Sequence, residues 1–114
     1  MNAQTPAPAD ANGWTPLLDV SQLPEGKGLA AHVGEHSIAL FRVGEQVHAL
    51  GEQCSHEAAS LAEGQVLEGR CVECPMHGAR FDLRTGRALC LPAVRPVKVY
   101  PVRVTQGRVE VKLN

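Results

Sequence analysis

Long hydrophobic runs are missing from this sequence of 114 residues, so it contains no candidate for a membrane-spanning helix. A targeting signal is missing too, because residues 1–13 contain no basic cluster, no apolar stretch and no twin arginine. We therefore expect residues 1–13 to form a flexible tail and residues 14–114 to form one domain. These absences predict a cytoplasmic protein without a membrane partner.

An excess of positive charge is also absent. The chain has 11 Lys and Arg residues against 12 Asp and Glu residues, a formal net charge of −1 at pH 7. Nucleic-acid binding depends on a basic surface, so this balance excludes nucleic acid as the main partner. Residues 1–79 hold three basic and ten acidic side chains, whereas residues 80–114 hold eight and two. Solvated strand faces explain this asymmetry better than a docking surface does.

Aromatic side chains make up only 4% of the chain, so the core must consist mainly of Val, Leu and Ala. A metal site would help to stabilise so small a domain. Eleven glycines and eight prolines separate short β-like segments, which predicts an all-β fold of antiparallel sheets. The expected strands lie within residues 15–20, 29–34, 36–44, 46–54, 70–75, 79–89, 97–104 and 108–113.

Two features refine this expectation. Apolar residues alternate from Val97 to Leu113, which predicts antiparallel strands with one buried face. Only residues 57–63 look helical, and we expect them to form a loop because they are so few.

Four cysteines are present, and in a reducing cytosol they favour metal ligands or free thiols over disulfides. Two of them begin short segments that also contain a histidine: Cys54-Ser55-His56 and Cys74-Pro75-Met76-His77. Seventeen residues separate the two segments. Each segment thus pairs a thiolate former with an imidazole, and the sequence predicts a metal site at Cys54, His56, Cys74 and His77.

Two kinds of metal centre are compatible with these ligands. Two Cys and two His can bind one tetrahedral Zn²⁺, but zinc sites usually take both cysteines from one half and both histidines from the other. Here each half supplies one of each. This suits a [2Fe–2S] cluster in which one iron has two sulfur ligands and the other has two imidazoles.

The segments CSHEAASL and VECPMHGARFDLRTG resemble the two cluster-binding loops of Rieske ferredoxins. The likeness extends from Trp14 to the C-terminal hairpin and is closest to ferredoxin components of bacterial aromatic-ring-hydroxylating dioxygenases. It implies a Rieske fold, namely antiparallel sheets with a small cluster-binding subdomain, and loops near residues 54–60 and 74–81. It also implies that Cys54 and Cys74 bind the inner iron of one [2Fe–2S] cluster, and His56 and His77 the outer one. In the family a proline-containing segment covers the cluster, and Leu91-Pro92-Ala93 matches it.

The resemblance implies a one-electron carrier between a flavoprotein NAD(P)H reductase and a terminal oxygenase. It does not imply an enzyme, and neither a nucleotide-binding glycine loop nor a separate catalytic iron site is evident in the sequence. The alternatives are a small subunit of an NADH-dependent nitrite reductase, many of which lack the four ligands, and a structural zinc module.

High-potential Rieske proteins carry a disulfide between the loops and hydroxyl groups that donate to the cluster. The corresponding positions here are Ala59 and Met76 for the disulfide, and Ala79 and Phe81 for the hydroxyl groups. Fewer hydrogen bonds stabilise the reduced state less, so we expect a potential near the low end of the Rieske range, roughly −150 mV.

The remaining candidates have simpler interpretations. Cys71 and Cys90 fit no ligand position and are expected to be small buried residues of strands. The histidines outside the two segments, His32, His36 and His48, are expected to be surface or half-buried strand residues. Solvated charge explains Arg80, Arg84 and Arg87 better than a docking patch does.

Overall fold

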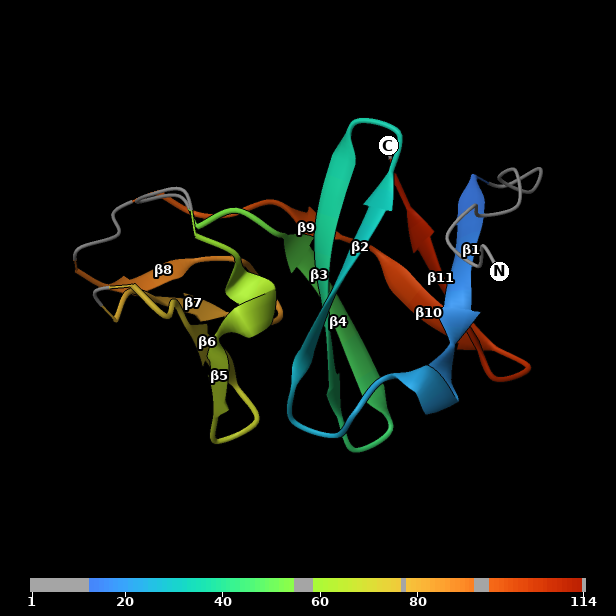
Figure 1. Ribbon diagram of the computed structural model, residues 1–114, viewed down its shortest axis with the longest axis horizontal. Helices are drawn as coiled ribbons and strands as arrows, with labels where there is room; N and C mark the ends of the chain where they lie inside the picture. Colours follow the sequence, from blue (N-terminus) through green and yellow to red (C-terminus); the bar gives the residue numbers. More distant parts are fainter. Residues whose placement is uncertain (1–12, 55–58, 77, 92–94, 114) are drawn as a thin grey trace.

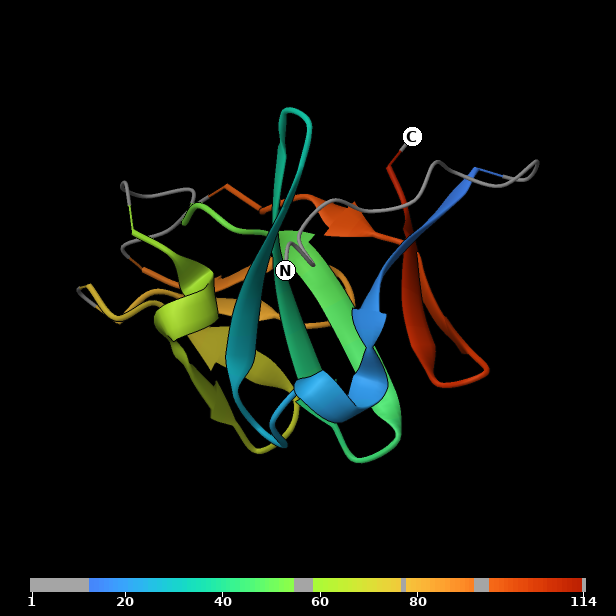
Figure 2. The same ribbon diagram turned by 45° about the vertical axis from the view of Figure 1, so that its right-hand side comes forward.

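The computed structural model describes residues 13–54, 59–76, 78–91 and 95–113, and these residues form three antiparallel β-sheets and two 3₁₀ turns. The predicted all-β fold is therefore confirmed. Figure 1 shows the sheets one after another along the longest axis, and Figure 2 shows the same arrangement after rotation. We refer to them as the terminal sheet (β1, β10, β11), the central sheet (β2, β3, β4, β9) and the small sheet (β5 to β8).

The terminal sheet joins the two ends of the domain. Its strand order is β1-β11-β10, with β1 at Trp14–Asp19, β10 at Val102–Thr105 and β11 at Arg108–Lys112. The register of β1 shifts between Pro16 and Leu18. Proline has no N–H to donate to a sheet, so a bulge is a position where it is tolerated. The 3₁₀ turn η1 (Val20–Gln22) follows β1 and was not predicted.

The central sheet is a meander of three strands, and a fourth strand from later in the chain lies at one edge. Its members are β2 (Gly28–Val33), β3 (His36–Val43), β4 (Gln46–Gly51) and β9 (Val99–Tyr100). Two-residue turns join the first three strands, and each turn begins with a glycine of positive φ, 58° at Gly34 and 62° at Gly44. This is the backbone that tight hairpins require, so the predicted hairpin at Gly34-Glu35 is confirmed.

The small sheet contains β5 (Gln65–Leu67), β6 (Cys71–Glu73), β7 (Arg80–Asp82) and β8 (Ala88–Cys90), in that order. The turn η2 (Leu61–Glu63) precedes it. The prediction of a loop over residues 57–63 was wrong for residues 61–63, while residues 57 and 58 lie outside the described residues. Strand β5 was missed because three residues are too few to show an alternation.

Two apolar clusters lie on opposite faces of the central sheet. Strand β3 serves both, since Ile38 and Leu40 belong to the cluster shared with the terminal sheet, whereas Ala39 and Phe41 belong to the other. All four are 0% exposed. A strand buried on both faces needs a continuous apolar run, which explains why Ile-Ala-Leu-Phe does not alternate.

The predicted alternation from Val97 to Leu113 is only partly correct. Val109 and Val111 are buried, but Val104 is 41% exposed. Pro101 separates β9, which pairs with β4, from β10, which pairs with β11, so this segment serves two sheets instead of one continuous face.

The small sheet is an insertion between two neighbouring strands. Strands β4 and β9 pair with each other although the whole small sheet lies between them in the chain. The amide of Gly51 donates to the carbonyl oxygen of Lys98 over 2.8 Å where the chain leaves and re-enters the central sheet. Among the residues described, no helix is long and apolar enough to cross a membrane.

Candidate metal centre

Cys54 and Cys74 lie in the same apolar cluster, although they come from different sheets. Cys54 follows β4 of the central sheet and is 2% exposed, whereas Cys74 directly follows β6 of the small sheet and is 1% exposed. Their cluster fills the space between the two sheets and includes Phe41, Leu61 and Phe81. The fold therefore brings the two predicted sulfur ligands into one buried region.

Each cysteine begins a short loop, and the two loops are closed in the same way. The amide of Cys54 donates to the carbonyl oxygen of Ala59 over 2.9 Å, and the amide of Cys74 donates to that of Ala79 over 2.6 Å. Gln53 pairs with Ser60 outside the first closure, as Glu73 pairs with Arg80 outside the second. We call residues 54–59 and 74–79 the first and second ligand loops.

The predicted imidazole ligands, His56 and His77, lie outside the described residues. In the sequence, each stands among the four residues between a buried cysteine and the alanine that closes its loop. Their role as ligands stays a prediction.

The surroundings of the cysteines fit a metal centre. Burying two thiolates without a compensating charge is costly, so a bound metal ion is the natural counterpart of a pair of buried thiolates. Thiolate and imidazole together suit zinc or an iron–sulfur cluster. Within the described ranges, no three His, Cys, Asp or Glu side chains form a competing metal site. Ala79 and Phe81 are 0% exposed in the same cluster and carry no hydroxyl group.

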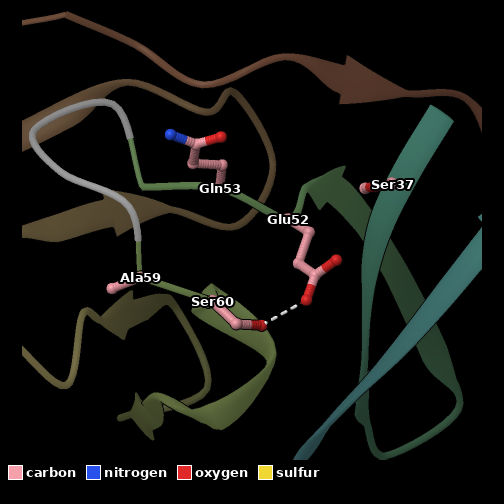
Figure 3. A pocket seen from close by; sticks show the side chains of 5 residues that line it. All are labelled: Ser37, Glu52, Gln53, Ala59 and Ser60. Carbon is pink, nitrogen blue, oxygen red and sulfur yellow. Dashed lines mark hydrogen bonds between the residues drawn. The ribbon is translucent and has the colours of Figure 1, made fainter. Parts of the chain in front are cut away.

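Polar side chains contact each other across the base of both loops. A shallow pocket of about 240 Å³ lies beside the first loop, lined by Ser37, Glu52, Gln53, Ala59 and Ser60. Figure 3 shows the Glu52 and Ser60 side chains meeting in it. At the second loop, Nε of Arg80 lies 3.2 Å from Oε2 of Glu73. Sequence reasoning missed these contacts, because Glu52 is eight positions from Ser60 and no motif joins them.

Cys71 and Cys90 lie outside the two ligand loops, and neither forms a disulfide. Cys71 is half-buried, and burial is the main cause that raises the pKa of its thiol. Cys90 is exposed, so the prediction that it is buried was wrong. Its Sγ lies 3.7 Å from the carbonyl oxygen of Gly78, beside the second ligand loop. Strand β8 is at the edge of the small sheet, which leaves this side chain open to solvent.

The three other histidines are strand residues, as predicted. His32 is exposed on β2, and Nδ1 of His36 lies 3.3 Å from the hydroxyl oxygen of Tyr100. His48 is half-buried on β4, and burial followed by the nearby Arg84 guanidinium lowers the pKa of its imidazole, although Asp82 opposes this.

The arginines near the second loop are all exposed. Arg84 lies in the β7–β8 turn, where its amide donates to Oδ1 of Asp82 over 2.8 Å, and the amide of Thr85 donates to the same oxygen over 3.0 Å. Burial alone would raise the pKa of Asp82, but these hydrogen bonds outweigh it and lower the pKa. The acidic side chain therefore stabilises the turn in its ionised form.

Comparison with known protein families gives a match over most of the chain. Residues 13–101 match the Rieske [2Fe-2S] domain family. The chain is 43% identical over 101 residues to the anthranilate 1,2-dioxygenase ferredoxin subunit of Burkholderia cepacia, which covers 89% of this chain and 93% of that protein.

Solved structures agree with this result. A structure of the complex of reduced oxygenase and oxidized ferredoxin in carbazole 1,9a-dioxygenase contains a chain with a TM-score of 0.79 and 36% identity. That match covers 88% of this chain and 93% of the other. A small subunit of an NADH-dependent nitrite reductase from Mycobacterium tuberculosis gives a TM-score of 0.77 and 34% identity, covering 86% of this chain and 92% of that one.

Proposed function

This chain belongs to the Rieske [2Fe-2S] domain family, and we propose that it holds one [2Fe–2S] cluster through Cys54, His56, Cys74 and His77. It is a ferredoxin component of an aromatic-ring dioxygenase system, an electron carrier and not itself an enzyme. It passes single electrons from a flavoprotein reductase to a terminal oxygenase.

The observation that carries the ligand assignment is the matched construction of the two loops. Two buried cysteines from different sheets each begin a span of four residues, and the same backbone hydrogen bond closes each span. Each span contains one histidine in the sequence, so each loop offers one thiolate and one imidazole. This equal division suits two irons with unlike ligands better than it suits one zinc ion.

The bound cluster would accept and release one electron, and its two neutral imidazoles make that easier than four thiolates would. The chain supplies a buried, apolar inner side. Cys54 and Cys74 are fixed by their own amide hydrogen bonds, and the apolar Phe81 lies in the same cluster. Fixed ligands limit the rearrangement that accompanies each change of charge.

We place the protein in the cytosol with its reductase. The exposed thiol of Cys90 supports this location, because such a thiol persists most readily in a reducing compartment.

Iron and acid-labile sulfide analysis of the purified chain, with EPR of the reduced state, tests the ligand assignment. We expect two irons and two sulfides per chain, which is the composition of a [2Fe–2S] cluster. We expect His77→Ala and His56→Ala to lose the reduced-state signal, while the control His36→Ala keeps it. A colourless protein containing zinc, or an unchanged signal in His77→Ala, would contradict the assignment.

Similarity to a nitrite reductase small subunit supports a second candidate, in which the chain serves an NADH-dependent nitrite reductase. Reconstitution separates the two. The reduced protein should donate electrons to a terminal ring-hydroxylating oxygenase during single turnover and should fail to co-purify with a sirohaem protein. The opposite pair of results would favour the second candidate.

A further inference from the structure

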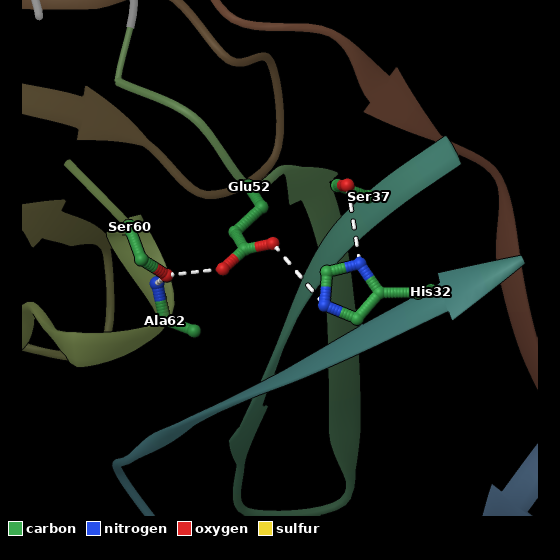
Figure 4. A network of polar contacts seen from close by, with 5 residues as sticks. All are labelled: His32, Ser37, Glu52, Ser60 and Ala62. Atoms are coloured by element: carbon green, nitrogen blue, oxygen red, sulfur yellow. Dashed lines mark hydrogen bonds and ion pairs between the residues drawn. The ribbon is translucent and has the colours of Figure 1, made fainter. Parts of the chain in front are cut away.

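The surroundings of the two ligand loops differ in the side chains that they offer to another protein. Beside the first loop, the hydroxyl of Ser60 donates to Oε2 of Glu52 over 2.6 Å, and Nε2 of His32 lies 3.8 Å from Oε1 of the same carboxylate. Figure 4 shows these contacts and the 3.1 Å contact between Nδ1 of His32 and the hydroxyl oxygen of Ser37. These polar groups satisfy one another. Beside the second loop, exposed apolar and basic side chains lie on and around strand β8.

Strand β8 presents apolar side chains to solvent. Leu89 is 48% exposed, and Leu91, which directly follows the strand, is 76% exposed. Cys90 lies between them and is also exposed. Single exposed apolar residues are common on protein surfaces, but adjacent ones form a patch of the kind that marks an interaction site.

The outer edge of β8 is unpaired within the described residues. The strand stands last in the order β5-β6-β7-β8. Edge strands usually carry charged side chains that discourage pairing with other chains. Strand β8 is Ala88-Leu89-Cys90 and carries none. Three residues allow little backbone pairing, so the side chains must supply most of the contact with a partner.

Arginines flank this apolar strand. Arg80 is the neighbour of Cys90 on β7, Arg87 immediately precedes β8, and both arginines are exposed. Arg80 shares its charge with Glu73, which it contacts over 3.2 Å. Asp82 is the only acidic residue in the segment 80–91, and its Oδ1 accepts from two amides of its own turn. The hairpin therefore has an excess of positive charge at its surface.

The combination changes the meaning of these arginines. From the sequence alone they fit solvated charge, but the structure gives them an exposed apolar strand to surround. Protein interfaces are commonly built in this way, with an apolar centre and a polar rim. A basic rim is complementary to a partner that carries carboxylates.

Strand β8 also lies against the second ligand loop. Sγ of Cys90 is 3.7 Å from the carbonyl oxygen of Gly78, a residue of that loop. Met76 belongs to the same loop and is 48% exposed, so the loop adds a further apolar side chain. A protein bound on β8 would therefore lie next to the loop that begins at the proposed ligand Cys74, where electron transfer needs it to be.

We propose that Leu89, Cys90 and Leu91, with Arg80 and Arg87 beside them, form the surface on which the terminal oxygenase docks. We call these five residues the β8 patch. The matching surface of the oxygenase is apolar at its centre and has carboxylates around it. The proposal rests on the proposed function, which supplies the partner. A second copy of this chain fits less well, because a two-fold contact sets the same patch against itself and would oppose two basic rims.

The concentration of reduced protein that half-saturates electron transfer to the terminal oxygenase tests this proposal. Leu91→Ser and Arg87→Glu should each raise it about tenfold, the effect of losing one important interface contact. The effect of Arg87→Glu should shrink at high salt, whereas that of Leu91→Ser should not. The maximal rate should not change, because no proposed ligand is altered.

Matched controls are available on the terminal sheet, which lies at the opposite end of the molecule (Figure 1). Val104→Ser removes an apolar side chain that is 41% exposed, and Arg108→Glu reverses an exposed charge. Both variants should half-saturate the oxygenase within about twofold of wild type, as expected of surface substitutions outside an interface.

Modification of Cys90 gives an independent test that needs no substitution in the patch. A bulky maleimide on this thiol should raise the half-saturating concentration at least about tenfold, because it occupies the space of the partner. Cys90→Ser treated with the same reagent should behave like untreated wild type, which controls for labelling of Cys71.

Three results would overturn the docking surface. They are wild-type half-saturation in both patch variants, equal weakening in the controls, and full activity of protein labelled at Cys90. A wild type that dimerises in analytical ultracentrifugation and separates in Leu91→Ser would also overturn it, since a second copy would then occupy the patch. A wild type that lacks an iron–sulfur cluster or cannot reduce the oxygenase would overturn the proposed function instead. A competent wild type with unaffected variants would overturn only the role of the β8 patch.

Discussion

Replacing Gly64 by alanine should disturb the metal centre without removing any ligand. Gly64 follows η2, and its amide donates to the carbonyl oxygen of Leu61 over 2.9 Å. A Cβ atom at this position would overlap the carbonyl oxygen of Glu73 and would lie 3.0 Å from Cγ2 of Val72. Ordinary contact begins near 3.4 Å, so the backbone must move. Glu73 immediately precedes Cys74, and the displacement therefore reaches a proposed ligand.

The magnitude follows from the overlap. Overpacking that forces a backbone shift costs about 1–3 kcal/mol, and here the overlapping atom is a main-chain oxygen that no rotamer change can relieve. We expect the free energy of unfolding to fall by an amount near the upper end of this range, about 2–3 kcal/mol. For a domain of this size, each 1 kcal/mol lost from the free energy of unfolding lowers the thermal midpoint by about 4–8 °C. The thermal midpoint of Gly64→Ala should therefore fall by at least about 8 °C.

Gly51→Ala is the matched control. Its Cβ would meet only ordinary contacts, the nearest being the backbone nitrogen of Lys98 at 3.6 Å. Removing a glycine from a position that alanine tolerates stabilises a protein by about 0.4–1 kcal/mol through the unfolded state. The assay compares thermal midpoints at one scan rate, together with iron and sulfide content. If Gly64→Ala melts within a few degrees of Gly51→Ala and keeps its full iron content, the reasoning is refuted.

Three further predictions follow from particular residues. A redox titration should give a potential near −150 mV, and Phe81→Tyr or Ala79→Ser should raise it by adding a hydroxyl; a wild-type value well above zero would contradict this. Burial lowers the pKa of His48 from 6.5, so its contribution to stability is present above pH 6.5 and is lost as the pH falls through the folded-state pKa. His48→Gln should therefore flatten the fall in thermal midpoint between pH 7.5 and 5.5, and curves of equal slope would argue against it. A thiol reagent should label Cys90 before Cys71, and Cys90→Ser should keep the cluster; preferential labelling of Cys71 would disagree with the exposure of Cys90.

The sequence predicted those parts of the fold that depend on local chemistry. Glycines at Gly34 and Gly44 marked tight turns, because such turns need a positive φ that other residues adopt at a cost. The strands around these turns were long enough to recognise. The two segments containing Cys54 and Cys74 were recognisable because cysteine and histidine in close sequence have a specific chemistry.

Other features depend on contacts between distant parts of the chain and could not be read from the sequence. The exposure of Val104 follows from the division of the segment at Pro101 between two sheets. Cys90 is exposed because β8 is an edge strand, and the order of strands in a sheet is a tertiary property. The hydrogen bond between Glu52 and Ser60 likewise forms only where the fold brings these two residues together.

The place where the small sheet joins the rest of the molecule has a consequence for engineering and for evolution. Because the chain departs at Gly51 and returns at Lys98 beside it, the intervening segment resembles a cassette with adjoining ends. We expect such a cassette to be exchangeable between related scaffolds, because its strands belong to a sheet of their own. The cassette cannot be deleted without cost, because it packs against Phe41 and Leu50. Its removal would expose these apolar side chains to water. A grafted cassette must therefore include the apolar residues that pack against the central sheet as well as the two ligand loops.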